Sequence, residues 1–186
     1  MNNQFEIEVE GRKVLTLRDI LPTCMKMLII GKSPARVSAQ KGHYFQGRQG
    51  KLLWSRLKEY GLLKVPPGKY DDEVLAKLRY GITDIVKVPR NFGSEPTDVE
   101  YRKGLRRILE LVGHSRPHVL FLVYKRVLDK ILELAYHWET KSHYGFNPEL
   151  ETLFQCKVFV FPMPGTPCKT EEAILAMNEL KAELKR

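Results

Sequence analysis

The sequence predicts an α/β fold, in which one three-layer α/β/α domain is built around a mainly parallel central sheet. Apolar segments of strand length alternate along the chain with longer segments in which apolar residues recur at helical spacing. Residues 118–124 (HVLFLVY) form a continuous apolar run, which is typical of a parallel strand buried on both faces. A chain of 186 residues suits one sizeable core better than two, so we expect a single domain over residues 1–186.

The first half of the chain predicts a strand, a helix and a second strand. Residues 26–31 (KMLIIG) are largely apolar and end at a glycine, as a short buried strand would. Residues 50–60 (GKLLWSRLKEY) place leucines and a tryptophan at helical spacing, and Gly61 then ends the helix. Residues 81–89 (GITDIVKVP) contain β-branched side chains and stop at Pro89, so we expect a short strand.

The second half continues this alternation. Thr97 and Glu100 have the spacing of a capping box, which indicates that a helix begins there. The helix has one apolar face, and arginines and lysines surround its other sides. The remaining elements are, in chain order, the strand at 118–124, a helix at 125–138, a polar and irregular segment at 139–155, a strand at 156–162 and a final helix capped by Thr170.

The charge balance predicts a basic surface. Lys and Arg number 31 against 22 Asp and Glu, for a net charge of +9. This excess favours a polyanion as partner, although charge alone does not separate nucleic acid from an acidic protein or membrane headgroups. The longest apolar run, near VLFLVY, is far shorter than the ~20 residues that span a membrane. The segment MNNQFEIEVE is too acidic and polar for a signal peptide, so we expect an intracellular protein with no membrane partner.

The three cysteines, Cys24, Cys156 and Cys168, predict no disulfide framework and no metal site. Their number is odd, and no two of them have the C-x-x-C spacing of zinc or iron–sulfur ligands. We therefore expect reduced thiols, no bound metal and no cofactor.

The segment in which a strand runs into Gly31-Lys32-Ser33 has the appearance of a Walker A phosphate loop. That loop requires another glycine five residues earlier, where this chain has Lys26. Pro34 biases the residue before it away from the helical region, so no helix can begin at Gly31 to bind a phosphate. We therefore predict a strand end followed by a tight polar loop, and a nucleotide-binding enzyme is the least favoured function.

Three loops are expected at one edge of the sheet, because ligands of such folds bind beyond the carboxyl ends of parallel strands. These loops are GKSPARVSAQKGHYF after the first predicted strand, the segment around DIVKVPRN, and PMPGTPCK after the last strand. All three are rich in glycine, proline or basic residues. The basic side chains that could gather there are Lys32, Arg36, Lys41, Arg48, Lys87, Arg90 and Lys169.

The order and spacing of these loops resemble those of the mismatch-specific uracil-DNA and thymine-DNA glycosylases. In that family a strand ends in G-I-N-P-G, followed by K-G-H-x-Y or G-F-P-F and by a helix with a tryptophan. This chain has LIIGKSPARVSAQKGHYFQG and then Trp54. The family's GVT-x-LV-x-RP is matched by GITDIVKVP, and its N-P-S-G-L-S or M-P-S-S-S-A-R by PMPGTPCK. The likeness runs from about LRDILPTCMKMLIIG to the last helix and implies a uracil-DNA-glycosylase-like fold.

The resemblance implies a pocket for a base flipped out of double-stranded DNA. Phe45 stands where the family has the aromatic side chain that stacks on the base, and a plain core aromatic residue is the alternative. The backbone N–H of Lys32, next to Gly31, stands where the family binds a pyrimidine carbonyl, and it would stabilise charge on the leaving base. His43 would lie near the pocket as a weaker catalytic candidate, although it could instead be a surface residue or a hydrogen-bond strut.

The resemblance also implies that the loop MPGTPCK wedges into the duplex. Pro167 stands at the tip, where a stiff apolar residue suits a wedge, and Lys169 could contact a phosphate. An ordinary proline-rich turn would have the same composition. The DNA-binding residues expected on this loop are Pro164, Gly165, Thr166, Pro167 and Lys169.

Two positions depart from the family pattern. Ser33 replaces the asparagine that positions the attacking water, and Met163 replaces a polar residue of the base-binding site. The chain is therefore either a weak or inactive relative, or another residue has taken over the chemistry. Asp84 is the candidate, because a carboxylate could activate water and stabilise the positive charge that develops on the sugar. Asp84 could instead be solvated or form a salt bridge with Lys87 or Arg90.

The predicted function is a monofunctional DNA glycosylase of base excision repair that works as a monomer. It would flip uracil, or thymine or another damaged base opposite guanine, and hydrolyse the N-glycosidic bond without metal or cofactor. The alternative is a catalytically weak or inactive module on the same fold that binds DNA or a damaged base without turnover.

Overall fold

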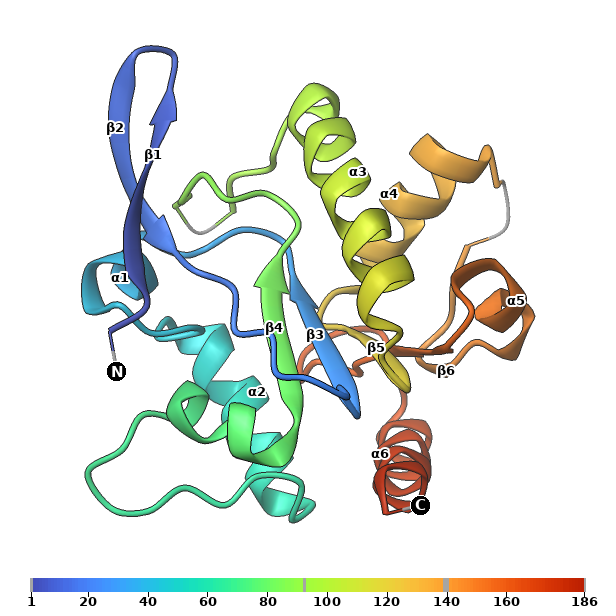
Figure 1. The fold of residues 1–186 in the computed structure, drawn as a ribbon. Coiled ribbons are helices and arrows are strands. Elements are labelled where there is room, and N and C mark those ends of the chain that lie inside the picture. Colours follow the sequence, from blue (N-terminus) through green and yellow to red (C-terminus); the bar gives the residue numbers. More distant parts are fainter. Residues whose placement is uncertain (1, 92, 139–140, 186) are drawn as a thin grey trace.

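The computed structural model describes residues 2–91, 93–138 and 141–185. Its central sheet has five strands in the order β4-β3-β5-β7-β6 (Figure 1). The first four run parallel, and β6 pairs antiparallel with β7 at the edge. The predicted α/β class with a mainly parallel sheet is therefore confirmed. The strands are β3 (Met27–Gly31), β4 (Tyr80–Asp84), β5 (Val119–Leu122), β6 (Gly145–Phe146) and β7 (Lys157–Val160).

Helices cover both faces of this sheet and complete the three layers (Figure 1). No helix in the described residues is both long and apolar enough to cross a membrane. One face carries α2 (Arg48–Glu59) and α6 (Thr170–Leu184), and the other carries α3 (Asp98–Ser115), α4 (Lys125–Tyr136) and α5 (Glu151–Phe154).

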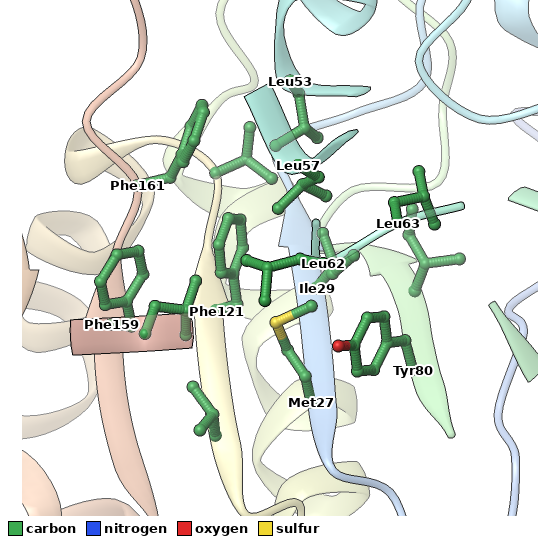
Figure 2. Packing of buried hydrophobic residues seen from close by; sticks show 14 of the residues in the cluster. Met27, Ile29, Leu53, Leu57, Leu62, Leu63, Tyr80, Phe121, Phe159 and Phe161 are labelled. Atoms are coloured by element: carbon green, nitrogen blue, oxygen red, sulfur yellow. The ribbon is translucent and has the colours of Figure 1, made fainter. Parts of the chain in front are cut away.

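The core forms because every strand residue of β3 is apolar or glycine and successive side chains alternate between the two faces. Met27 and Ile29 belong to the α2/α6 hydrophobic cluster, whereas Leu28 and Ile30 belong to the α3/α4 cluster. Figure 2 shows the first cluster, in which leucines of α2 lie against β3 beside the stacked rings of β5 and β7. This two-sided burial holds the strand ends at one fixed edge.

Several predicted boundaries are confirmed in detail. The Thr97 side chain accepts a hydrogen bond from the Glu100 N–H at 3.3 Å, and the Glu100 carboxylate accepts one from the Thr97 N–H at 2.8 Å. This is the predicted capping box at the start of α3. Gly61 follows the C-cap of α2 with φ +70°, a conformation that glycine adopts without strain.

Three predicted boundaries are wrong. The strand expected over 81–89 ends at Asp84, because the following residues pair with the loop after β3 instead of extending the sheet. Thr170 is the first residue of α6, and Lys169 is its N-cap without a side-chain hydrogen bond. The described part of 139–155 is not uniformly irregular, since it contains β6, a 3₁₀ turn and α5; residues 139 and 140 lie outside the described residues.

No element is predicted before residue 26, yet the chain begins with a hairpin of β1 (Gln4–Val9) and β2 (Arg12–Leu17). Its two turn residues, Glu10 and Gly11, both have positive φ, as a tight two-residue hairpin requires. The signal was present, because Phe5-Glu-Ile-Glu-Val alternates apolar and acidic residues. The hairpin packs on α1 (Arg36–Lys41) and extends past the end of β4 (Figure 1).

Candidate functional site

A cleft of about 880 Å³ lies at the carboxyl ends of β3 and β4. All three predicted loops contribute to its lining: Lys32 and Ser33 from the first, Asp84 from the second and Pro164 from the third. Phe45 closes one side. The tertiary structure therefore gathers five of the predicted site residues around one opening.

A second hollow, of about 950 Å³, lies at the opposite edge of the sheet. It is lined by residues at the amino ends of the strands, such as Lys26 and His118, and by none of the predicted site residues. Because ligands of parallel α/β sheets bind at the carboxyl edge, we assign the chemistry to the smaller cleft.

Backbone hydrogen bonds continue the pairing of β3 and β4 past the strand ends, to residues that line the cleft. The Ile85 N–H donates to the Gly31 carbonyl at 3.0 Å, and the Arg90 N–H donates to the Pro34 carbonyl at 2.9 Å. These bonds join the loop after β3 to the loop after β4. As predicted from Pro34, no helix begins at Gly31; α1 begins five residues later. The two loops are therefore hydrogen-bonded to each other where they line the cleft.

Asp84 and Gly31 lie opposite each other as the last paired residues of β4 and β3. A Cβ atom added to Gly31 would lie 2.1 Å from Asp84 Oδ1 and 3.0 Å from Phe45 Cζ. The carboxylate and the aromatic ring thus both contact the backbone at Gly31, and no side chain fits there. The glycine allows a charged group and an aromatic face to meet within one small space.

The Asp84 carboxylate is buried without a matched partner. Asp84 is 1% exposed, and within the described chain no donor forms a hydrogen bond with its Oδ2 atom. Burial raises the pKa of Asp84 from 3.8 to about 7; the positive charge of Lys87 opposes this rise, the negative charge of Asp19 adds to it, and Arg107 opposes it. A carboxyl group of this kind titrates near neutral pH and is typical of functional sites.

Phe45 is held in a strained backbone conformation. Its φ of +55° lies in the left-handed region, which an aromatic residue rarely adopts. Its ring meets that of Trp54 edge-on, with centroids 5.8 Å apart. A Cβ at Gly50 would lie 2.4 Å from the Phe45 carbonyl oxygen, so the start of α2 packs directly beneath this residue. The surroundings thus fix the half-buried ring at the cleft wall.

His43 acts as a strut beneath Phe45. It is 6% exposed, its Nδ1 lies 2.8 Å from Asp72 Oδ1, and its ring stacks on Tyr70. Asp72 also accepts the Tyr44 N–H at 2.8 Å, which anchors the chain next to Phe45. His43 is buried and does not line the cleft in the described structure, so of its three predicted roles (catalytic residue, surface residue or hydrogen-bond strut) the structure favours the strut.

The loop after β7 divides into a buried base and an exposed tip. Met163 is 4% exposed and packs in the α2/α6 cluster, so it lies outside the cleft lining, whereas its neighbour Pro164 lines the cleft. Gly165 and Pro167 are exposed, and the Thr166 hydroxyl donates to the Met163 carbonyl at 2.7 Å. Of the predicted wedge residues, Pro164 therefore lines the cleft, and the exposed tip follows directly after it in the chain.

Lys169 follows this loop at the N-cap of α6. Its side chain is 80% exposed and lies 4.0 Å from Glu172, a contact that solvent screens. The ammonium group is therefore available to an external anion at the same edge of the sheet.

Tyr124 and Glu95 are among the cleft residues that were not predicted from the sequence. Tyr124 lines the cleft at the start of α4, and burial together with the charge of Asp84 raises its pKa to about 12. Glu95 also lines the cleft, and it accepts a hydrogen bond from Lys32 Nζ at 2.9 Å. Tyr124 follows the end of β5, so the carboxyl-edge rule could have found it. No comparable signal marked Glu95.

The comparison with known families agrees with this geometry. The family model described as uracil DNA glycosylase superfamily matches residues 19–167 of the 186-residue chain. The matched range contains the whole central sheet and every residue that lines the cleft except Leu17. It excludes the hairpin and the whole of α6. From this match over well over half of its length, the chain belongs to the uracil DNA glycosylase superfamily.

Proposed function

We propose that the protein is a monofunctional, monomeric DNA glycosylase of the mismatch-specific uracil and thymine type. Its superfamily supports glycosylase chemistry on DNA and a place in base excision repair. The observation that carries the proposal is the Asp84 carboxylate, which is buried, lacks a hydrogen-bond donor to Oδ2 in the described chain, and faces the cleft that Phe45 lines. Its preferred substrate is uracil opposite guanine in double-stranded DNA.

Binding begins when the target base leaves the stack and enters the cleft. Unstacking costs a few kcal/mol, which contacts inside the pocket must offset. Stacking on the Phe45 ring contributes ~1–3 kcal/mol. The Lys32 N–H, at the end of β3, would donate to a pyrimidine carbonyl and to the negative charge that grows on the leaving base. Pro167 and its neighbours at the rim would fill the space that the base vacates.

The chemical step needs an anion near the sugar. When the N-glycosidic bond breaks, its electron pair leaves with the base and C1′ becomes electron-poor. Ionised Asp84 stabilises this positive charge, and it accepts the proton of the water that adds to C1′. Only the ionised form can act, so the excision rate should rise with pH through about 7 and then level off.

Three variants test these roles by single-turnover excision from a U·G duplex. Asp84→Asn should lower the rate ~10²-fold or more, because it removes the anion. Ser33→Ala should lower the rate about tenfold or less, since a neutral hydrogen bond to water contributes ~0.5–1.5 kcal/mol. Ser33→Asn, which restores the residue of the similar family, should retain or raise activity. If Asp84→Asn matches the wild type while Ser33→Ala is inactive, the assignment is reversed.

The second candidate function is a module that binds DNA or a damaged base without turnover. It is favoured by Met163, which is buried among apolar residues and offers almost no hydrogen bonding to a base. Duplexes with uracil, thymine, hypoxanthine or an etheno adduct opposite guanine, treated with alkali after incubation, separate the two. Strand cleavage supports the glycosylase, and gel retardation without cleavage supports the module.

A further inference from the structure

A partly buried ion cluster lies next to Asp84. Asp19, in the segment between β2 and β3, accepts hydrogen bonds on Oδ1 from Lys87 Nζ at 2.6 Å and from the Thr83 hydroxyl at 2.7 Å. Its Oδ2 accepts one from Arg107 Nη1 at 2.7 Å. The three charged side chains are between 16% and 35% exposed, so solvent screens their interaction only in part.

The cluster is bonded to the backbone of Asp84 itself. Arg107 Nη2 donates to the Asp84 carbonyl oxygen and lies 3.1 Å from the Thr83 hydroxyl. The guanidinium is therefore hydrogen-bonded to the last two residues of β4. Close packing of α3 makes this reach possible. A Cβ at Gly104 would lie 1.9 Å from the Ile85 carbonyl oxygen, and Arg107 follows one helical turn later.

The charges in the cluster do not cancel. Two cations, Lys87 and Arg107, surround one anion, Asp19, which leaves a net charge of +1. A single cation would suffice to tie Asp19 to the sheet. Ionised Asp84 brings the local sum to zero, which offsets the cost of burying its carboxylate. The titratable groups that face Asp84 are Asp19 before β3, Tyr44 before α2, Lys87 after β4, Arg107 on α3 and Tyr124 at the start of α4.

We propose that Asp19, Lys87 and Arg107 are positioning residues, which fix the Asp84 backbone and supply the net positive charge that keeps its carboxylate ionised for catalysis. The catalytic part of this inference rests on the proposed glycosylase function. The electrostatic part concerns only the protein, and it can be measured without DNA.

The direct test follows the Asp84 side-chain carboxyl carbon by ¹³C NMR during a pH titration, with Asp84→Asn identifying the signal. Lys87→Met should move the titration midpoint up by about one pH unit, because a nearby cation is lost. Asp19→Asn should move the midpoint down, because a nearby anion is lost. Lys64→Met is the matched control, since Lys64 is exposed and does not line the cleft, and it should leave the midpoint unchanged.

Asp19→Asn leaves Lys87 and Arg107 without their shared anion and can fail to fold, so the double variant Asp19→Asn/Lys87→Met is included. It keeps the net charge of the cluster at +1 and should return the midpoint close to that of the wild type. Thermal melting confirms that each variant is folded. Equal midpoints in the wild type and in either folded single variant, or a midpoint of the double variant that differs clearly from that of the wild type, would overturn the inference.

Excision rates measured against pH complete the experiment. The acid limb of the wild-type profile should move in the same direction as the NMR midpoint in each variant. If the NMR midpoints shift as expected but neither the wild type nor any variant excises a base, the glycosylase proposal is refuted. The electrostatic role of the cluster is then retained. If the wild type excises uracil but the NMR midpoints of the variants do not differ from that of the wild type, the proposed role of the cluster is refuted. The glycosylase proposal is then retained.

Discussion

Replacing Asp84 by Asn should make the protein more stable at neutral and alkaline pH, even though it removes the proposed catalytic group. The reason lies in the burial of this carboxylate, whose pKa rises from 3.8 to about 7 on folding. Between these two pH values the folded state holds a proton that the unfolded state has released. Stability contributed by this group therefore falls as pH rises from 4 to 7 and stays low above 7.

The size of the effect follows from the same shift. A difference of about 3 pH units corresponds to roughly 4 kcal/mol at 1.36 kcal/mol per unit. The asparagine amide would still lack hydrogen-bond partners at this site, which reduces the gain to ~2–4 kcal/mol. At ~2–4 °C per kcal/mol for a chain of this length, the Tm at pH 8 should rise by roughly 5–15 °C. At pH 4 the gain should nearly vanish, because wild-type Asp84 is then neutral when folded.

Thermal unfolding of both proteins at pH 4 and pH 8 measures this difference. Asp72→Asn is the matched control, because Asp72 is as buried as Asp84 but accepts hydrogen bonds from Asn3, Tyr44 and His43. It should lower stability at pH 8 by ~1–3 kcal/mol, since it disrupts satisfied bonds. If Asp84→Asn is less stable than the wild type at pH 8, Asp84 has a partner that the described structure does not contain, and the reasoning fails.

Three further predictions concern DNA binding. Lys169→Ala should weaken binding to all sequences and flatten the salt dependence of log K by about 1, and an unchanged slope in salt titrations would remove Lys169 from the interface. Phe45→Ala should weaken binding of the flipped base by ~1–3 kcal/mol. If the folded variant excises uracil at the wild-type rate, Phe45 has only a packing role. Glu95→Gln should tighten binding, most clearly at low salt in fluorescence anisotropy, because it releases Lys32 and Arg126 for phosphates. Unchanged affinity would mean that these cations do not face the DNA.

The fold class and the edge that carries the cleft could both be predicted from the sequence. Strand length, helical spacing and the Thr97–Glu100 capping box are local properties, because residues close in the chain largely decide them. Ligands of parallel sheets bind beyond the carboxyl ends of the strands, and this rule predicted that the loops of Ser33, Asp84 and Pro164 meet at one edge. In the structure these three residues line one cleft. Local patterns failed where the chain leaves the sheet, as at the end of β4, because pairing with a distant loop decided that boundary.

Only the tertiary structure decided the chemical character of the site. Asp84 in GITDIV is an ordinary carboxyl group until β3, the Phe45 ring and α3 enclose it and remove water. Its ionisation depends on Asp19 and Arg107, which lie 65 residues before it and 23 after it. The interaction between two charges depends on how far apart they lie in space. Their separation along the chain does not determine that distance. The sequence by itself therefore determined which residues are present at the sheet edge, and packing determined which of them are buried, paired or poised to react.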